Sequence, residues 1–492
     1  MKTRIFLTIL IATTFVTNSD LIAQNTEINE TKSIKQHISQ YMNWYDIPGL
    51  SIGLIKNGEI YYTKGFGIKC IDSKEKVTKN TIFSTASVTK LFVGMAIMQL
   101  NEENKVDLNK SVSSYLPYFE LIDTLFKKIT IKQLLNHTSG LPDEEGDEFY
   151  SSWENPEYDD DALKRYVKGL KSKTLVSIPG ENYNYSNIGY EILGCVVSEV
   201  SGISLEDYIN NNIIKPIGMQ HSNMLLNNID TNLLACPHIL DKDLKFKINE
   251  YFPYTRRHSA SGTLLSNIDD MCRFAITILN KGIIDKNRIL KESSLKKMLT
   301  LENDNPAGLS WHITEVDSTM TLIFHAGGDP GFRTELILIP EKQLGVVIMA
   351  NMWEHQIEPL AYKMLNILLE DDEKDWFTFF HGSTWEIIRT NNASSALDKI
   401  KSFISDNNDQ KFHPAILNQH SNSLLEIGRI NYAIELRKFN VELYPKISKL
   451  YDLLAEVYLQ NEQTDWAIKN YEKSLELNPE NTNAKEMLEK LK

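Results

Sequence analysis

The sequence lacks the excess of positive charge that a nucleic-acid-binding surface requires. Its 492 residues include 65 acidic and 52 basic side chains, which give a formal net charge of −13. Proteins bind phosphate backbones through clustered Lys and Arg, so the composition argues against nucleic acid as a partner. A single hydrophobic core is not expected at this length, and two or more domains are predicted.

Cysteine is also scarce, and its spacing disfavours zinc. The four cysteines form no C-x-x-C pair, and the eleven histidines are scattered without metal-ligand spacing. Two acidic stretches, 143–148 and 159–161, are interpreted as solvated loops, with calcium binding as the alternative. We therefore expect no metal and no cofactor. An oxidising compartment would allow disulfides, whereas buried free thiols are an equally good interpretation, and the sequence cannot pair the cysteines. They are Cys70, Cys195, Cys236 and Cys272.

Long hydrophobic runs are absent after the N-terminus, so no membrane span is expected in the mature chain. At the N-terminus two basic residues precede an apolar run from Ile5 to Val16, and Ala23 provides a small residue for cleavage. This order is typical of a secretory signal peptide, which we predict over residues 1–23. An N-terminal anchor is the alternative, although the run is short for a span. We expect an exported protein, either periplasmic or secreted.

Several common catalytic signatures are missing. The sequence contains no G-x-S-x-G nucleophile elbow, no H-E-x-x-H zinc motif, no P-loop and no glycine-rich dinucleotide-binding pattern. The first absence disfavours an α/β-hydrolase, and the others disfavour zinc-dependent and nucleotide-dependent enzymes.

Strand-like segments at both ends bracket a helix-rich region from 83 to 301. Residues 50–55 and 60–66 are apolar runs joined by Lys56-Asn57-Gly58, a strong hairpin signal. Strands that enclose a helical insert predict an α+β fold, an antiparallel sheet flanked by helices. Later strands are expected at 321–325, 333–340 and 344–350, and flanking helices at 31–46 and 358–369.

Glycine almost disappears beyond the acidic run 370–375, where only Gly382 and Gly428 remain and the pattern becomes helical. A 34-residue period that closes on proline resembles the tetratricopeptide repeat, an all-α unit. His420 and Arg437 stand where that repeat usually has apolar residues. The matched pairs are Leu424 and Tyr458, Ala433 and Ala467, Val441 and Leu475, and Pro445 and Pro479.

The chain is therefore divided into four parts. Residues 1–23 form the signal peptide, 24–370 the domain with the sheet, 371–412 a helical linker and 413–492 the repeats. Two units are few for a repeat stack, so the repeats are expected to lean on linker helices or on the first domain. They are also the expected surface for a protein partner.

The first chemical motif is Ser87-Val88-Thr89-Lys90, at the start of an apolar helix. A serine and a lysine three residues apart share one helix face, so the amine can reach the hydroxyl. The helix N-terminus adds the positive end of its dipole beside the nucleophile. S-x-x-K alone is a weak signal, and an N-capping serine before an ordinary helix is the alternative. Ser87 is the candidate nucleophile, and Lys90 is its partner.

The second motif is Tyr185-Ser186-Asn187. A phenol beside an ammonium has its pKa lowered, because the opposite charge favours phenolate. Tyr185 is therefore expected to take the serine proton and return it to the leaving group. Asn187 can donate to the carbonyl region of a substrate. A tyrosine packed in an aromatic loop is the alternative, and this is the interpretation given to Tyr183 and Tyr190.

The third motif is His325-Ala326-Gly327-Gly328, at the end of an expected strand. Glycines let a substrate backbone approach a strand edge, and the Gly328 N–H is expected to complete an oxyanion hole with that of Ser87. A lone histidine in a strand is more often structural. Its order after the other two motifs makes His325, with Gly327 and Gly328, a candidate binding residue.

With the three motifs in this order, the chain resembles the serine β-lactamase, penicillin-binding protein and D-alanyl-D-alanine peptidase superfamily, in its class C-like and esterase-like branch. The resemblance covers about residues 30–370 and implies a β-lactamase/transpeptidase-like fold. It also implies a nucleophile, Ser87, with an activating pair, Lys90 and Tyr185. The implied binding residues are Asn187, His325 and Gly328. Further segments similar to family hallmarks are Leu134–Leu141, Pro216–Met219, Ser261–Ser266 and Gly327–Asn351.

One residue departs from the family pattern, because penicillin-destroying members usually carry lysine where His325 stands. Lysine offers a permanent charge to the lactam carboxylate, whereas histidine near neutral pH offers a partial and pH-dependent one. The expected function is that of a serine hydrolase with a Ser87 acyl-enzyme. Its small-molecule or peptide substrate would be an ester, a D-amino-acid peptide or amide, or a β-lactam. The alternative is a catalytically weak scaffold whose repeats hold a protein partner.

Overall fold

The structure is a computed structural model, and it describes residues 18–143, 147–302, 305–354, 357–371, 376–407 and 411–491. Most of the predicted signal peptide, residues 1–17, lies outside the described residues. So do parts of the two acidic stretches that begin at 143 and at 370.

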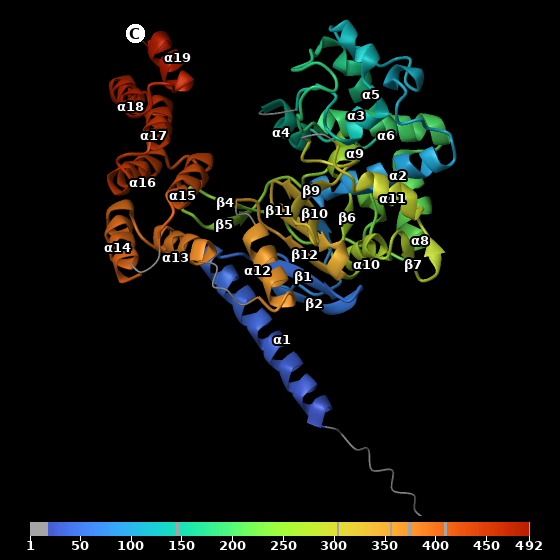
Figure 1. Cartoon of the computed structure of the whole chain (residues 1–492), viewed down its shortest axis with the longest axis horizontal. Helices are drawn as coiled ribbons and strands as arrows, with labels where there is room; N and C mark the ends of the chain where they lie inside the picture. The colour runs from blue at the N-terminus through green and yellow to red at the C-terminus, as the bar shows by residue number, and fades with distance from the viewer. Residues whose placement is uncertain are drawn as a thin grey trace, which may run out of the picture.

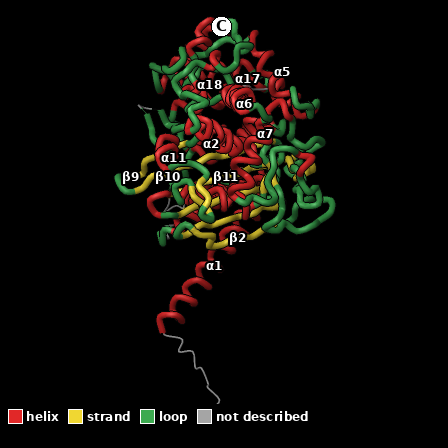
Figure 2. The backbone as a smooth tube through the Cα atoms, turned by 90° about the vertical axis from the view of Figure 1, so that its right-hand side faces the viewer, coloured by secondary structure: helices red, strands yellow, loops and turns green. Residues whose placement is uncertain are grey.

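A six-stranded antiparallel sheet forms the centre of the molecule, in the order β2-β1-β12-β11-β10-β9. Figure 2 shows the strands gathered on one side of the helical insert. The predicted α+β fold is thereby confirmed. The strands are β1 (Gly49–Lys56), β2 (Glu59–Gly67), β9 (His312–Asp317), β10 (Met320–Asp329), β11 (Phe332–Ile339) and β12 (Leu344–Ala350).

The β1–β2 hairpin turns at the predicted dipeptide. Asn57 and Gly58 have φ of 58° and 72°, the left-handed values that a two-residue type I′ turn requires. Asn and Gly adopt this region more readily than other residues, so the turn follows from the local sequence.

Both faces of the sheet are buried at β1, β11 and β12, which explains why these strands are continuous apolar runs in the sequence. In β11, Leu336 and Leu338 join the core beneath the helical insert, whereas Ile337 and Ile339 join a second core on the opposite face. The edge strand β9 was not predicted, because only Ile313 among its six residues is buried.

Helices cover each face of the sheet. On the insert face α10 (Ile268–Leu279) packs on the strands, and α2 (Thr89–Glu102) and α6 (Asn187–Ser201) belong to the same core. The opposite face is covered by α1 (Asn18–Tyr45) and α12 (Glu358–Leu368). Helix α1 begins thirteen residues before the predicted start at 31, since no Gly or Pro interrupts the segment. The other insert helices are α3 (Ile131–Leu135), α4 (Asp147–Glu154), α5 (Ala162–Gly169), α7 (Leu205–Ile209), α8 (Lys215–Ile217), α9 (Ser259–Gly262) and α11 (Glu292–Met298). Short strands are β3 (Phe83–Ser84), β4 (His238–Leu240), β5 (Phe246–Ile248), β6 (Leu265–Ser266), β7 (Ile283–Ile284) and β8 (Asn287–Arg288).

The C-terminal part is all helical, as predicted, and stands beside the sheet-bearing part as a column of helices drawn in orange and red (Figure 1). It joins the rest of the protein through α13, which packs on α1, so that a Cβ added at Gly382 would lie 2.2 Å from the Trp44 ring. The helices are α13 (Trp376–Thr390), α14 (Ala393–Asp406), α15 (Ala415–Glu426), α16 (Ile430–Leu443), α17 (Ser448–Gln460), α18 (Thr464–Leu477) and α19 (Thr482–Leu491).

The two polar residues that depart from the repeat pattern are buried and hydrogen-bonded. His420 Nε2 lies 2.9 Å from Thr384 Oγ1 of α13. Arg437 donates to Ser421 Oγ at 2.8 Å and to Asn422 Oδ1 at 2.6 Å. Buried polar groups are retained where they find such partners. His420 thus connects the repeat-like helices to α13 through a polar contact.

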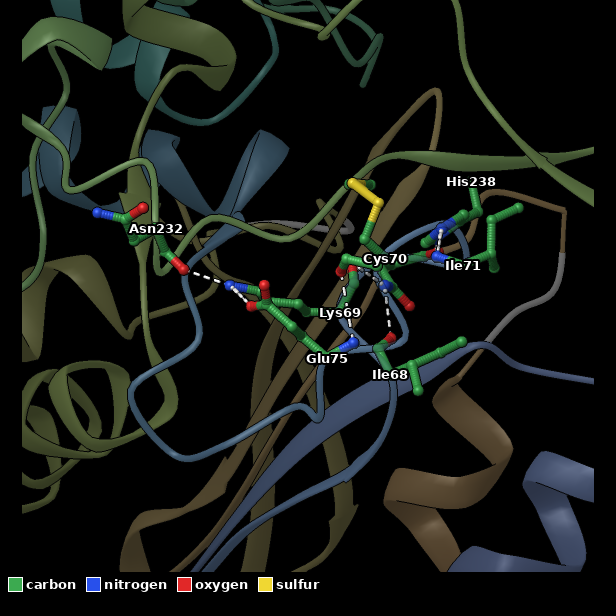
Figure 3. Close-up of a disulfide and its surroundings, with 10 residues drawn as sticks. Ile68, Lys69, Cys70, Ile71, Glu75, Asn232 and His238 are labelled. Atoms are coloured by element: carbon green, nitrogen blue, oxygen red, sulfur yellow. Dashed lines mark hydrogen bonds and ion pairs between the residues drawn. A yellow bond between two sulfur atoms is a disulfide. The ribbon is translucent and has the colours of Figure 1, made fainter.

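One pair of cysteines is bonded. Cys70 and Cys236, 166 residues apart, form a disulfide, while Cys195 and Cys272 are free and buried. Figure 3 shows the neighbouring contacts, in which Lys69 bonds Asn232 and Glu75, and the Ile71 N–H donates to His238 Nε2 at 3.2 Å. The bridge therefore ties the loop after β2 to the segment that leads into β4.

Among the described residues, no single helix has both the length and the apolar composition to cross a membrane. One bent pair, Asn187–Ser201 with Leu205–Ile217, satisfies those two criteria jointly.

Candidate active site

Ser87 and Lys90 meet at the start of α2. Ser87 lies in a 3₁₀ turn (Ala86–Val88) directly before the helix, so Lys90 follows one turn later on the same face. The Lys90 amine contacts Ser87 Oγ at 2.9 Å and donates to the Ser261 carbonyl at 3.0 Å. The expected serine–lysine contact is therefore formed in the folded chain.

Burial shifts the protonation equilibrium of Lys90, whose side chain is 0% exposed. Desolvation lowers its pKa to about 8, against the opposing effect of three acidic groups, Asp143, Glu191 and Asp329. In mildly alkaline solution, Lys90 is consequently an uncharged amine in a substantial fraction of the molecules. Such an amine can accept the Ser87 proton.

Tyr185 lies on the loop that enters α6, where Ser186 caps the helix by accepting from the Gly189 N–H at 3.2 Å. The Lys90 amine is 5.1 Å from the centre of the Tyr185 ring, and His137 stacks on that ring at 4.4 Å. The structure thus brings the second predicted motif to the first.

The expectation that Lys90 lowers the pKa of Tyr185 is wrong. Burial raises the pKa of this phenol, and a hydrogen bond with Ser87 opposes the rise only in part. Forming a phenolate in this desolvated site requires more free energy than the attraction of a partly neutral Lys90 supplies. Tyr185 is therefore a neutral phenol in the resting site, better suited to pass on a proton than to take the first one.

Asn187 is oriented by a carboxylate. Its side-chain amide donates to Asp143 Oδ1 at 3.0 Å, and its backbone N–H donates to the same oxygen at 2.9 Å. This double contact fixes the amide beside Tyr185. Asp143 was predicted only as part of an acidic loop.

The glycines of β10 allow that strand to approach the nucleophile. A Cβ added at Gly327 would lie 2.2 Å from the Thr85 carbonyl oxygen and 3.2 Å from the Ser87 nitrogen, so no side chain fits there. Gly328 pairs with Arg333, and a Cβ added at it would lie 2.4 Å from Arg333 Nη1. The contribution of the Gly328 N–H to an oxyanion hole remains a prediction.

His325 is on the same face of β10 as Gly327 and is 2% exposed. Burial and the neighbouring His312 and Lys90 hold its pKa well below the usual range. Its Nδ1 lies 2.7 Å from the Ala326 carbonyl and therefore carries the hydrogen of a neutral ring. The partial positive charge expected from the sequence is absent near neutral pH.

Two further histidines line the site and were not predicted as functional. His137 lies inside Leu134–Leu141, and His312 begins β9, with its ring 5.2 Å from that of His325 and 6.3 Å from that of Tyr185. Desolvation lowers the pKa of both imidazoles. His137 stood in a segment already noted for its resemblance, whereas His312 belongs to the strand that the sequence did not predict.

An antiparallel sheet with a helical insert, and a buried serine–lysine contact between them, are the features of penicillin-binding proteins and serine β-lactamases as a class. Residues 34–363 match the beta-lactamase family model, and the chain belongs to that family.

Curated relatives match over the same region. Protein flp of Staphylococcus aureus (strain MW2) is 29% identical over 319 residues, which are 64% of this chain and 62% of the relative. Penicillin-binding protein 4* of Bacillus subtilis (strain 168) is 26% identical over 314 residues, 61% of this chain and 67% of the relative. This chain thus spans less than two thirds of the length of Protein flp.

Solved structures share the architecture. The octameric penicillin-binding protein homologue from Pyrococcus abyssi is 26% identical, with a TM-score of 0.63 over 73% of this chain and 82% of that chain. A class C beta-lactamase, 21% identical with a TM-score of 0.57 over 69% of this chain and 98% of that chain, shares the fold.

Proposed function

We propose that this protein is a serine hydrolase that forms an acyl-enzyme on Ser87 with a neutral ester or amide. The contact between Ser87 Oγ and the buried amine of Lys90, at 2.9 Å, carries the proposal. A scaffold without catalysis would have no need of a desolvated lysine at this position, since burying an amine costs free energy.

The proposed reaction has two halves. Ser87 Oγ attacks the substrate carbonyl while neutral Lys90 accepts its proton, and the tetrahedral oxyanion faces the N–H groups of Ser87 and Gly328. The bond to the leaving group then breaks, and Tyr185 relays a proton from Lys90 to the departing oxygen or nitrogen. Water then attacks the acyl carbonyl and gives a proton to Lys90. The bond from the acyl carbon to Ser87 Oγ breaks, and Ser87 takes a proton back.

His325 favours substrates without a carboxylate. A neutral, buried imidazole gives an anion no fixed positive charge, so the proposed substrates are neutral esters and amides, D-amino-acid amides and peptides included, ahead of β-lactams.

Labelling of the active serine tests the proposal. A fluorophosphonate should modify Ser87 and no other serine, as read by mass spectrometry of peptides, and Ser87→Ala should abolish the label. Lys90→Ala should slow labelling by about a hundredfold or more, the scale of a lost general base. An unmodified Ser87, with a catalytically silent chain, would favour the scaffold that holds a partner through its C-terminal helices.

We also propose that the protein is exported. The basic, apolar and small residues at its N-terminus support this, as does the Cys70–Cys236 disulfide, because such bonds persist in oxidising compartments. N-terminal sequencing of the protein from its own cell envelope or medium should begin at Gln24. Retention of Met1 in a cytosolic fraction would contradict export.

A further inference from the structure

The turn that carries the nucleophile is strained. Ala86, directly before Ser87, has a φ of 45°, a left-handed value that an alanine rarely adopts. A residue persists in this region only where its surroundings hold it, and such strain gathers at functional sites.

A chain of hydrogen bonds holds the turn. The Ala86 N–H donates to Ser84 Oγ at 3.1 Å, and Ser84 Oγ donates to Asp329 Oδ2 at 2.7 Å. Thr334 Oγ1 donates to the Ser84 carbonyl at 3.1 Å. Asp329 is the last residue of β10, so the strand that carries the glycines also anchors the turn that carries the serine.

Asp329 also acts on the amine beside Ser87. The carboxyl group is buried, and its charge stabilises the ammonium form of Lys90. Burial raises the pKa of Asp329 to about 7, against the opposing effects of Ser84, Lys90, Arg333 and His258. Above about pH 7 a carboxylate therefore faces the lysine.

We infer that Asp329 is a positioning residue for the nucleophile, which holds the Ala86 turn through Ser84 and is one of the acidic groups that act on the Lys90 amine. In the sequence, Asp329 was noted only as part of the segment Gly327–Asn351. The inference rests on the proposed function, since it concerns the same serine.

Other charged groups also face the lysine, and they define what a variant at Asp329 can change. Asp143 and Glu191 stabilise the ammonium and remain in place when Asp329 is replaced. His137, His312 and His325 lie near Lys90 with lowered pKa values, and Tyr185 is a neutral phenol. Replacement of Asp329 therefore removes one of three negative charges and leaves the others unchanged.

The test compares two variants that separate charge from geometry. Asp329→Asn keeps an oxygen that accepts from Ser84 and removes the ionisable group, whereas Ser84→Ala keeps the carboxyl group and removes the link to Ala86. The rate of fluorophosphonate labelling at Ser87 is measured between pH 5.5 and 9.5 in the full chain. Circular dichroism establishes that each variant is folded.

Asp329→Asn should move the acid limb of the rate profile to lower pH, because Lys90 then loses its proton more easily. Ser84→Ala should lower the plateau at least tenfold, because the link that holds the Ala86 turn is lost. If Asp329→Asn does not fold, Asp329→Glu should lower the plateau without moving the limb. An unmoved limb in Asp329→Asn, or an unchanged plateau in Ser84→Ala or Asp329→Glu, would overturn the inference. Absence of labelling in the parent protein would instead overturn the proposed function, and the inference with it.

Discussion

Lys90 is fully buried, and its amine reaches two oxygens, the Ser87 hydroxyl and the Ser261 carbonyl. Its pKa is lowered to about 8, whereas burial raises the pKa of Tyr185. Removal from water disfavours the charged form of each group, ammonium in one case and phenolate in the other. Lys90, rather than Tyr185, is therefore the first group to accept the serine proton.

The protonation of Lys90 makes labelling of Ser87 depend on pH. Below about pH 8 Lys90 is mostly protonated and cannot accept the serine proton, so labelling of Ser87 should rise about tenfold per pH unit and level off above that pH. Stopped-flow labelling across pH checks the profile. Tyr185→Phe is the matched control and should lower ester turnover while the acid limb stays in place. Loss of the acid limb of the rate profile in Tyr185→Phe would show instead that Tyr185 is the first base.

The second residue prediction concerns His325. Because the imidazole stays neutral, the ratio of lactam to neutral-ester turnover should be flat between pH 6 and 8, and the esters should be faster. His325→Lys should shift the ratio toward lactams by up to about tenfold, or about 1.4 kcal/mol of transition-state binding. Nitrocefin and p-nitrophenyl acetate provide the measurement. Rapid nitrocefin hydrolysis by the parent protein would show that another group binds the carboxylate.

Among the loops, the disulfide joins two segments that are also linked by a hydrogen bond from the Cys236 N–H to the Lys69 carbonyl at 2.8 Å. It closes a separation of 166 residues, and Pro237 beside it lies against Gly331, the turn between β10 and β11. A cross-link over so long a loop restricts the unfolded chain strongly. The bridge thus stabilises the segment that packs against the turn between β10 and β11.

Cys70→Ser should consequently lower the free energy of unfolding by about 2–5 kcal/mol, as measured by urea denaturation. Cys195→Ala, which removes a free thiol and leaves the bridge, is the control and should cost less. In denaturant without reductant, an alkylating reagent should modify the two free cysteines, Cys195 and Cys272. Alkylation of all four cysteines under those conditions would contradict the bond.

Across the whole molecule, one hydrophobic core runs from the outer face of the sheet into the C-terminal helices. Ile52 of β1, Trp385 of α13 and Tyr471 of α18 belong to it. Helix α1 connects the two parts, because Tyr45 bonds His381 and Trp44 packs against α13. The C-terminal helices therefore contribute to the stability of the sheet-bearing part.

Deletion of residues 372–492 should leave the labelling rate at Ser87 unchanged, because the site residues precede that segment. It should lower stability by about 3–6 kcal/mol, since two aromatic side chains, Trp44 and Tyr45, become exposed. Differential scanning calorimetry measures the loss. Gly382→Leu in the full chain, which forces α13 away from Trp44, should destabilise in the same direction. A deletion with parental stability would show that the C-terminal helices do not stabilise the sheet-bearing part.

The sequence by itself determined the local features of this protein. The turn at Asn57 and Gly58 follows from backbone sterics, and the spacing of Ser87 and Lys90 follows from the pitch of a helix. Tertiary structure alone decided the pairing of Cys70 with Cys236, the place of His312 on an unpredicted strand, and the contact of Asp329 with Ser84. It also reversed the expected pKa shift of Tyr185 and removed the charge of His325. Those properties depend on burial and on neighbours that are distant in the chain, and packing produces both only when the whole domain has folded.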